Sequence, residues 1–172
     1  MRIYAICAAL AVLVFSATFT PNAAQTNEVE TGPVTNLPLP RYVSLRSSEI
    51  NVRRGPGLDY RKDWVFRRSG LPVRVVDEYG DWRRVVDKDD AGGWVYHAMI
   101  TGRRTVLITG DGVLFREDPA STSAATAQAE RGVVARLRAC EVRWCEIEAE
   151  GHRGWVRKGD IWGVEEAEVF TR

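Results

Sequence analysis

The strongest constraint on the fold is an internal repeat. Residues 42–56 align without gaps on residues 105–119, at an offset of 63. The offset then falls to 62 and finally to 61, where Gly93-Trp94-Val95 meets Gly154-Trp155-Val156. Both single-residue deletions fall in stretches where loops are expected, and loops tolerate deletions. The chain is therefore a tandem duplication of one small unit.

Each copy is made of short segments in which apolar and polar residues alternate. Gly, Pro, Asn and Asp separate these segments. Residues 71–76 and 82–86 indicate two strands around a turn, and residues 93–96 indicate another strand. No segment shows a sustained helical period, and the Ala-rich run 121–129 favours a turn or a single helical turn. Five short strands per copy predict an all-β fold with two tandem small barrels, because a barrel limits exposed sheet edges.

Composition excludes several classes of function. The 172 residues are 45% hydrophobic and 27% charged, as in a soluble globular protein. A net charge of +1 argues against a nucleic-acid-binding protein, which is usually strongly basic. No phosphate-binding loop and no catalytic constellation occur at a recognisable spacing. We therefore expect no enzymatic activity, no cofactor and no nucleic-acid partner.

The N-terminal 24 residues resemble an export signal. Arg2 is followed by an apolar run over residues 3–15, and Ala23-Ala24 supplies small residues for cleavage after Ala24. The alternative is an uncleaved inner-membrane anchor over residues 3–20, because the uncharged run is about long enough to span a bilayer. Without that anchor we expect no stable membrane span. Either interpretation places the body of the protein outside the cytoplasm, in the periplasm or secreted.

Two cysteines remain beyond that segment, Cys140 and Cys145. An even number of cysteines in an oxidising compartment predicts a disulfide, and four intervening residues suit a tight hairpin. The competing interpretation is a zinc site with His152 as a third ligand. A structural zinc site needs four ligands, and no further Cys or His lies nearby. We therefore expect a structural disulfide and no metal.

The repeat defines the domain boundaries. Residues 25–40 are rich in Thr, Asn and Pro, and the Leu37-Pro38-Leu39-Pro40 stretch favours a stiff linker into the first strand. The first copy spans residues 41–103 and the second spans residues 104–165. Residues 166–172 form a C-terminal tail.

The ordered motifs of the first copy resemble the bacterial SH3-like domain. They are an Asn-Val-Arg-x-Gly-Pro turn at residues 51–56, a Trp-x-x-Val strand at residues 82–85 and Gly-Trp-Val at residues 93–95. The second copy resembles the variant of this domain that carries two cysteines. The resemblance covers residues 41–165 and implies a half-open barrel of five to seven strands that binds ligands without catalysis. It also implies an association with peptidoglycan or with peptides.

The two copies are not equivalent. The first keeps Gly55-Pro56-Gly57, Tyr60 and Trp64, which the second replaces with the run 120–129. Residues 41–104 carry 14 basic and 9 acidic side chains, a net charge of +5. Residues 105–172 carry 9 basic and 12 acidic side chains, a net charge of −3. Two interpretations stay open: the opposite charges serve docking of the copies, or the first copy receives an anionic, partly apolar ligand.

Candidate ligand-binding residues therefore come from the first copy: Arg53, Tyr60, Trp64, Trp94 and Tyr96. The planar guanidinium of Arg53 suits a carboxylate, although Arg116 at the matching position makes a structural role equally plausible. Tyr60 and Trp64 suit ligand contact or packing. Trp94 and Tyr96 share the strand face opposite Val95, but Trp94 recurs as Trp155, which favours capping of the barrel or sealing of the interface between copies.

These patterns predict an exported, non-enzymatic binding module of the bacterial cell envelope. Peptidoglycan is the leading ligand, because its stem peptides offer carboxylates to Arg53, Arg54, Arg61 and Lys62. The alternative is a periplasmic protein-interaction or scaffolding role with another envelope protein as partner.

Overall fold

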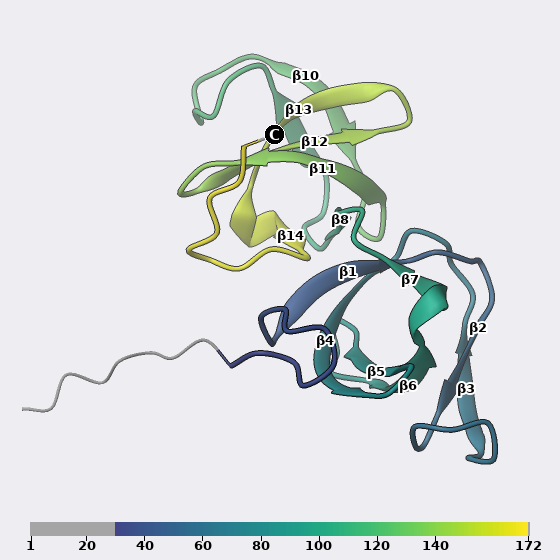
Figure 1. Ribbon diagram of the computed structural model, residues 1–172. Helices are drawn as coiled ribbons and strands as arrows, with labels where there is room; N and C mark the ends of the chain where they lie inside the picture. The colour runs from purple at the N-terminus through teal and green to yellow at the C-terminus, as the bar shows by residue number, and fades with distance from the viewer. Residues whose placement is uncertain (1–29, 172) are drawn as a thin grey trace, which may run out of the picture.

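The computed structural model describes residues 30–171, which form two barrels joined end to end (Figure 1). Module one contains seven strands and the single-turn helix η1 (His97–Met99). Its strands are β1 (Arg41–Leu45), β2 (Ile50–Arg53), β3 (Lys62–Phe66), β4 (Pro72–Tyr79), β5 (Trp82–Val86), β6 (Gly92–Tyr96) and β7 (Ile100–Thr101). The predicted signal segment 1–24 and the alternative anchor 3–20 lie outside the described residues.

Module two repeats this arrangement and contains the helix η2 (Lys158–Asp160). Its strands are β8 (Thr105–Ile108), β9 (Val113–Arg116), β10 (Ala125–Ala129), β11 (Val134–Cys140), β12 (Trp144–Ala149), β13 (His152–Arg157) and β14 (Ile161–Trp162). Within residues 30–171, no helix has the length and apolar character needed to cross a membrane.

The strand order is the same in both modules. The first sheet runs β3-β2-β6-β5-β4-β1-β7 and the second runs β10-β9-β13-β12-β11-β8-β14, with antiparallel pairing throughout. This identity confirms the predicted all-β fold of two tandem small barrels. Each module has seven strands rather than the five expected from the sequence, and the short final strands β7 and β14 pair back onto β1 and β8.

One local prediction is wrong. The Ala-rich run was expected to form a turn or a helical turn, but its second half is strand β10. Ala127 pairs with Phe115 of β9, and Ala129 pairs with Val113. Alanine has a high helix propensity, but here the neighbouring strand β9 offers main-chain hydrogen-bonding partners that local sequence does not reveal.

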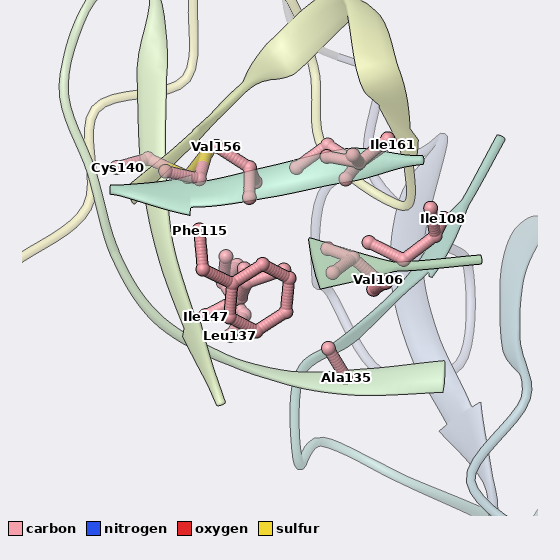
Figure 2. Packing of buried hydrophobic residues seen from close by; sticks show 12 residues of the cluster. Val106, Ile108, Phe115, Ala135, Leu137, Cys140, Ile147, Val156 and Ile161 are labelled. Carbon is pink, nitrogen blue, oxygen red and sulfur yellow. A yellow bond between two sulfur atoms is a disulfide. The ribbon is translucent and has the colours of Figure 1, made fainter. Parts of the chain in front are cut away.

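Alternating side chains fill each barrel. In module one, Val52, Val73, Val75, Val85 and Val95 have no exposed surface, because the two-residue alternation of their strands turns these side chains into the barrel. Figure 2 shows the matching core of module two, where Phe115 lies among Leu137 and Ile147. The repeat thus preserves the inward positions of both cores.

A glycine before a tryptophan lets two strands approach closely in both modules. A Cβ atom at Gly93 would lie 2.6 Å from the carbonyl oxygen of Arg53, and one at Gly154 would lie 3.0 Å from that of Arg116. Each close approach brings a single pair of residues into register, Arg53 with Trp94 and Arg116 with Trp155. A side chain at either glycine would force β2 from β6, or β9 from β13.

Buried hydrogen bonds join the modules. Thr105 Oγ1 donates to the carbonyl oxygen of Gly70 at 2.6 Å and lies 2.6 Å from Ser44 Oγ. Ser44 and Thr105 are both buried. Beside them the ring of Tyr42 meets the ring of Trp162 edge to face at 5.2 Å between centroids. The tryptophan in the junction is thus Trp162, whereas Trp94 lies within module one and Trp155 within module two.

The predicted disulfide is confirmed. Cys140 and Cys145 are bonded and pair directly across the β11–β12 hairpin. The bond excludes the alternative zinc site, because both thiolates that such a site would use are consumed. The predicted tail also contacts this hairpin: the main chain of Phe170 exchanges two hydrogen bonds with that of Cys140.

Residues 30–40, where the sequence favours a stiff linker, fold back onto module one. The carboxylate of Glu78, near the end of β4, has no exposed surface. It accepts hydrogen bonds from the main-chain N–H groups of Val34 and Thr35 and from the hydroxyl of Thr35, at 2.7 to 3.1 Å. Arg41 Nη2 lies 2.6 Å from the same carboxylate. Leu39 joins the core, so this segment is an integral part of module one.

These contacts make the stability of module one depend on pH. Burial alone would raise the pKa of Glu78, but the hydrogen bonds from Thr35, Arg41 and Val34 outweigh it and lower the pKa from 4.5 to about 2. Since the folded pKa is depressed, the stabilisation is present above pH 4.5 and is lost as the pH falls through about 2. We expect the free energy of unfolding to fall by about 3 kcal/mol over this range.

Urea unfolding of Glu78→Gln tests this contribution. The substitution should lower the free energy of unfolding at pH 7 by about 3 kcal/mol and flatten its dependence on pH below 4.5. Glu49→Gln, at an exposed glutamate of the same module, serves as the control. Equal stability of the two variants at pH 7 would contradict a clamping role for Glu78.

Candidate functional site

Arg53, Trp94 and Tyr96 lie on one outer face of module one. Their neighbours Val52 and Val95 point into the core, so alternation along β2 and β6 turns these three side chains outward. The register pairs Arg53 directly with Trp94. The structure thereby brings together three of the five residues that the sequence singled out.

Trp82 belongs to the same face, which the sequence alone leaves undecided. It pairs with Tyr96 across β5 and β6, and the two rings meet edge to face with centroids 5.8 Å apart. The guanidinium carbon of Arg53 lies 6.0 Å from the centre of the Trp82 ring, within the range of a cation–π contact. We call Arg53, Trp82, Trp94 and Tyr96 the aromatic face.

Arg53 also organises the loop that follows β2. Its Nη1 donates to the carbonyl oxygens of Leu58 and Tyr60 at 2.8 and 2.7 Å. The ring of Tyr60 lies against Gly55, where a Cβ atom would come within 2.4 Å of it, and is 49% exposed. Arg53 therefore holds the loop in a conformation that displays Tyr60.

Arg116 occupies the same position in module two and makes the same kind of contact. Its Nη1 donates to the carbonyl oxygen of Ser123 at 2.6 Å. Each arginine thus satisfies main-chain carbonyls of the loop that follows it, a structural role common to both modules. A carboxylate ligand at Arg53 would bind the guanidinium nitrogens that do not contact the loop. Carboxylate binding by Arg53 stays a prediction.

Trp64 lies apart from the aromatic face. It pairs with Val52, whose side chain is in the core, and it packs against that core. Its ring contacts Phe66 at 4.8 Å between centroids. The structure therefore supports the packing alternative for Trp64 and places Tyr60 as the aromatic of this loop that is open to a ligand.

Basic side chains surround the loop. Asp63 accepts hydrogen bonds from Arg61 at 2.8 Å and from Arg54 at 3.3 Å. The hydrogen bond from Arg61 is the main reason why the pKa of Asp63 lies below its ordinary value. Both arginine side chains are mostly exposed. Exposed ion pairs of this kind are weak, so the two guanidinium groups can exchange Asp63 for an anionic ligand.

Module two carries a hollow at the position that matches the aromatic face. Trp144 aligns with Trp82 of module one, and Arg157 aligns with Tyr96. Both line a hollow of about 630 Å³ together with Arg143 of the β11–β12 turn. The sequence prediction missed this feature. The one sequence signal for the hollow was that the second copy carries Arg143 and Arg157 near Trp144, a tryptophan that both copies share.

Metal ligands do not gather anywhere in residues 30–171: no group of three or more His, Cys, Asp or Glu side chains could hold an ion there. The chemistry that the aromatic face offers is stacking on exposed rings and hydrogen bonding to anions through guanidinium groups.

The role of Arg53 in the loop can be measured by hydrogen exchange. Arg53→Ala removes both bonds to the loop carbonyls, so the amides of residues 55 and 57–61 should exchange at least about tenfold faster than in the native protein, since about 1.4 kcal/mol of local opening energy corresponds to that factor. Arg84→Ala, on β5, should leave the exchange of this loop unchanged. Unaltered exchange in Arg53→Ala would exclude the organising role.

No curated protein matches the sequence. The solved structure of NlpC2 from Trichomonas vaginalis is similar with a TM-score of 0.34 and 9% identity, over 72% of this chain and 48% of that one. This chain therefore spans about half the length of that protein.

The model of the bacterial SH3 domain matches twice. The matched residues are 46–102 and 109–163, one segment in each module, and together they make up more than half of the chain. Bacterial SH3 domains are generally binding modules, often for the cell wall. The duplicated sequence, the identical sheets and this double match show that the chain is a tandem member of the bacterial SH3 domain family.

Proposed function

We propose that the protein is an exported, non-enzymatic binding module of the bacterial cell envelope, which recognises peptidoglycan or its peptides through module one. One observation carries this proposal: two tyrosines of module one are partly exposed, one in the loop that Arg53 orders and one on the aromatic face to which Arg53 belongs. Tyr60 is 49% exposed and Tyr96 is 39% exposed.

The chemistry of this surface suits an anionic, partly apolar polymer. Peptide carboxylates would bind the guanidinium groups of Arg54 and Arg61, which are exposed and both pair with Asp63. The tyrosine rings offer flat contact area at little cost in side-chain entropy. Neither feature requires the ligand to be chemically altered, which supports binding without catalysis.

An envelope protein is the alternative ligand. Leu58 lies at the tip of the same loop and is 75% exposed. An exposed leucine two residues from Tyr60 also suits a protein partner, since aromatic and apolar side chains form the centre of many interfaces. The two proposals therefore place different ligands on the same surface.

Co-sedimentation with purified peptidoglycan sacculi tests the first proposal. We expect the protein to sediment with sacculi at low and at physiological salt, and we expect Tyr60→Ala combined with Tyr96→Ala to reduce the bound fraction by about tenfold, as the loss of two stacking rings would. Trp64 is left intact because its substitution would disturb the core.

Leu114→Ala combined with Val169→Ala is the control, because both residues are exposed apolar side chains of module two, which carries no part of the aromatic face. Binding that vanishes at physiological salt would reveal only diffuse attraction to basic module one, which salt screens. That result, or equal binding by the double variant and the control, would overturn the proposed site. No binding at either salt would favour a protein partner.

A further inference from the structure

The hollow of module two is formed by three segments that lie apart in the sequence. They are residues 142–144 at the β11–β12 turn and the start of β12, residues 157–160 at the end of β13 and in η2, and residues 164–166. Ser121 adds to its rim. Its volume of about 630 Å³ falls within the range of sites for small ligands. Its position is separate from the aromatic face of module one.

The lining of the hollow includes two guanidinium groups, those of Arg143 and Arg157. Arg157 lies over the ring of Trp144, with its guanidinium carbon 5.5 Å from the ring centre. Its Nη2 is also 2.6 Å from Ser121 Oγ, so two contacts fix the orientation of this group. The neighbouring Arg143 is exposed, and no ion pair or hydrogen bond of its side chain is found among the described residues.

The lining also holds three carboxylates, those of Asp160, Glu165 and Glu166. Lys158 belongs to the lining as well, but its ammonium group donates to the carbonyl oxygens of Glu166 and Glu168. The lysine therefore holds the C-terminal segment in place instead of offering its charge to a ligand. A bound molecule would meet both guanidinium groups and carboxylates.

This arrangement is specific to module two. The repeat places Asp81 where module two has Arg143, and Tyr96 where it has Arg157. His97 replaces Lys158 and lies 3.9 Å from Asp81. Module one thus lacks both arginines of the hollow, although its net charge is the more positive. The two modules therefore present different chemistry at matching positions.

We propose that this hollow is a second binding site, for a short peptide with a free carboxylate at one end and an ammonium group at the other. The planar guanidinium groups of Arg143 and Arg157 would hold the carboxylate. The carboxylates of Asp160, Glu165 and Glu166 would hold the ammonium group and would repel a polyanion such as a polyphosphate, which favours a peptide of mixed charge. Trp144, Val142 and Val164 add apolar atoms to the lining.

The test uses the tripeptide Ala-Leu-Lys, which carries a free carboxylate and two ammonium groups. Two matched probes each lack one feature: the C-terminal amide of the same peptide, and N-acetyl-Ala-Leu-Met. Titration calorimetry gives the affinity, and the indole N–H resonance of Trp144, identified with Trp144→Phe, reports the place of binding. We expect the first peptide to bind and to shift this resonance, and both matched probes to bind at least about tenfold more weakly.

Arg143→Gln should weaken binding of Ala-Leu-Lys by about tenfold or more, because it removes a charge-assisted hydrogen bond. Arg143 is exposed, so this variant should keep its fold, as a circular dichroism spectrum would verify. Arg131→Gln, at an exposed arginine of the same module that pairs with Asp111 outside the hollow, is the matched control.

The proposal is overturned if millimolar Ala-Leu-Lys gives no heat and no shift, or if Arg143→Gln binds as well as the control. Equal binding of all three peptides would also overturn it, because the charges would then play no part. The test does not depend on the proposal that module one binds peptidoglycan, since it uses free peptides and reports binding at Trp144 of module two. The protein can therefore fail to bind sacculi while binding at this site is confirmed. It can also bind sacculi while this site is excluded.

Discussion

Both barrels depend on one close contact between strands. β6 can pass β2 only because Gly93 has no side chain, and Gly154 plays the same part for β13 and β9. This contact joins two strands to the rest of each sheet. They are β2 and β3 in module one, and β9 and β10 in module two. It also places the residue after each glycine opposite an arginine. The geometry around Arg53 and Arg116 is thus a direct result of main-chain packing.

Duplication preserved this framework while the surface side chains diverged. The valines of module one and their counterparts fill both cores, and each arginine supports the loop after its strand. The outer positions next to the shared tryptophan differ, with tyrosine in one module and arginine in the other. Net charge did not indicate this difference, because module two is acidic as a whole yet gathers arginines at its hollow. Local geometry decides what a ligand meets, whereas net charge acts at longer range.

The sequence predicted the features that repeat and alternate. The bounds of β5, the inward valines, the disulfide and the all-β class follow from two-residue alternation and from the matching of the copies. Strand β10 was missed because an alanine-rich segment has no intrinsic strand preference and owes its conformation to β9. The burial of Glu78 was equally invisible, since a charged residue in an alternating strand is expected to face solvent until another segment covers it.

The candidate site was predictable only in part. Arg53, Trp94 and Tyr96 meet on one face because neighbouring strands bring them there, and Tyr60 remains open beside them. Trp64 could not be placed from the sequence, because a bulge between Val52 and Arg53 changes the pairing of β2 with β3. The hollow of module two needed three distant segments to come together, and pairwise alignment of the copies does not show such an assembly.

The hydrogen bonds between Ser44, Thr105 and Gly70 affect how strongly the proposed sites of the two modules could act together. A flexible connection would let the modules sample many separations, so that a ligand held by one would meet the other only at a diluted effective concentration. A buried polar link fixes one separation instead. A polymer whose repeat matches that spacing would gain avidity without any new contact, and one with a different repeat would engage the modules only one at a time.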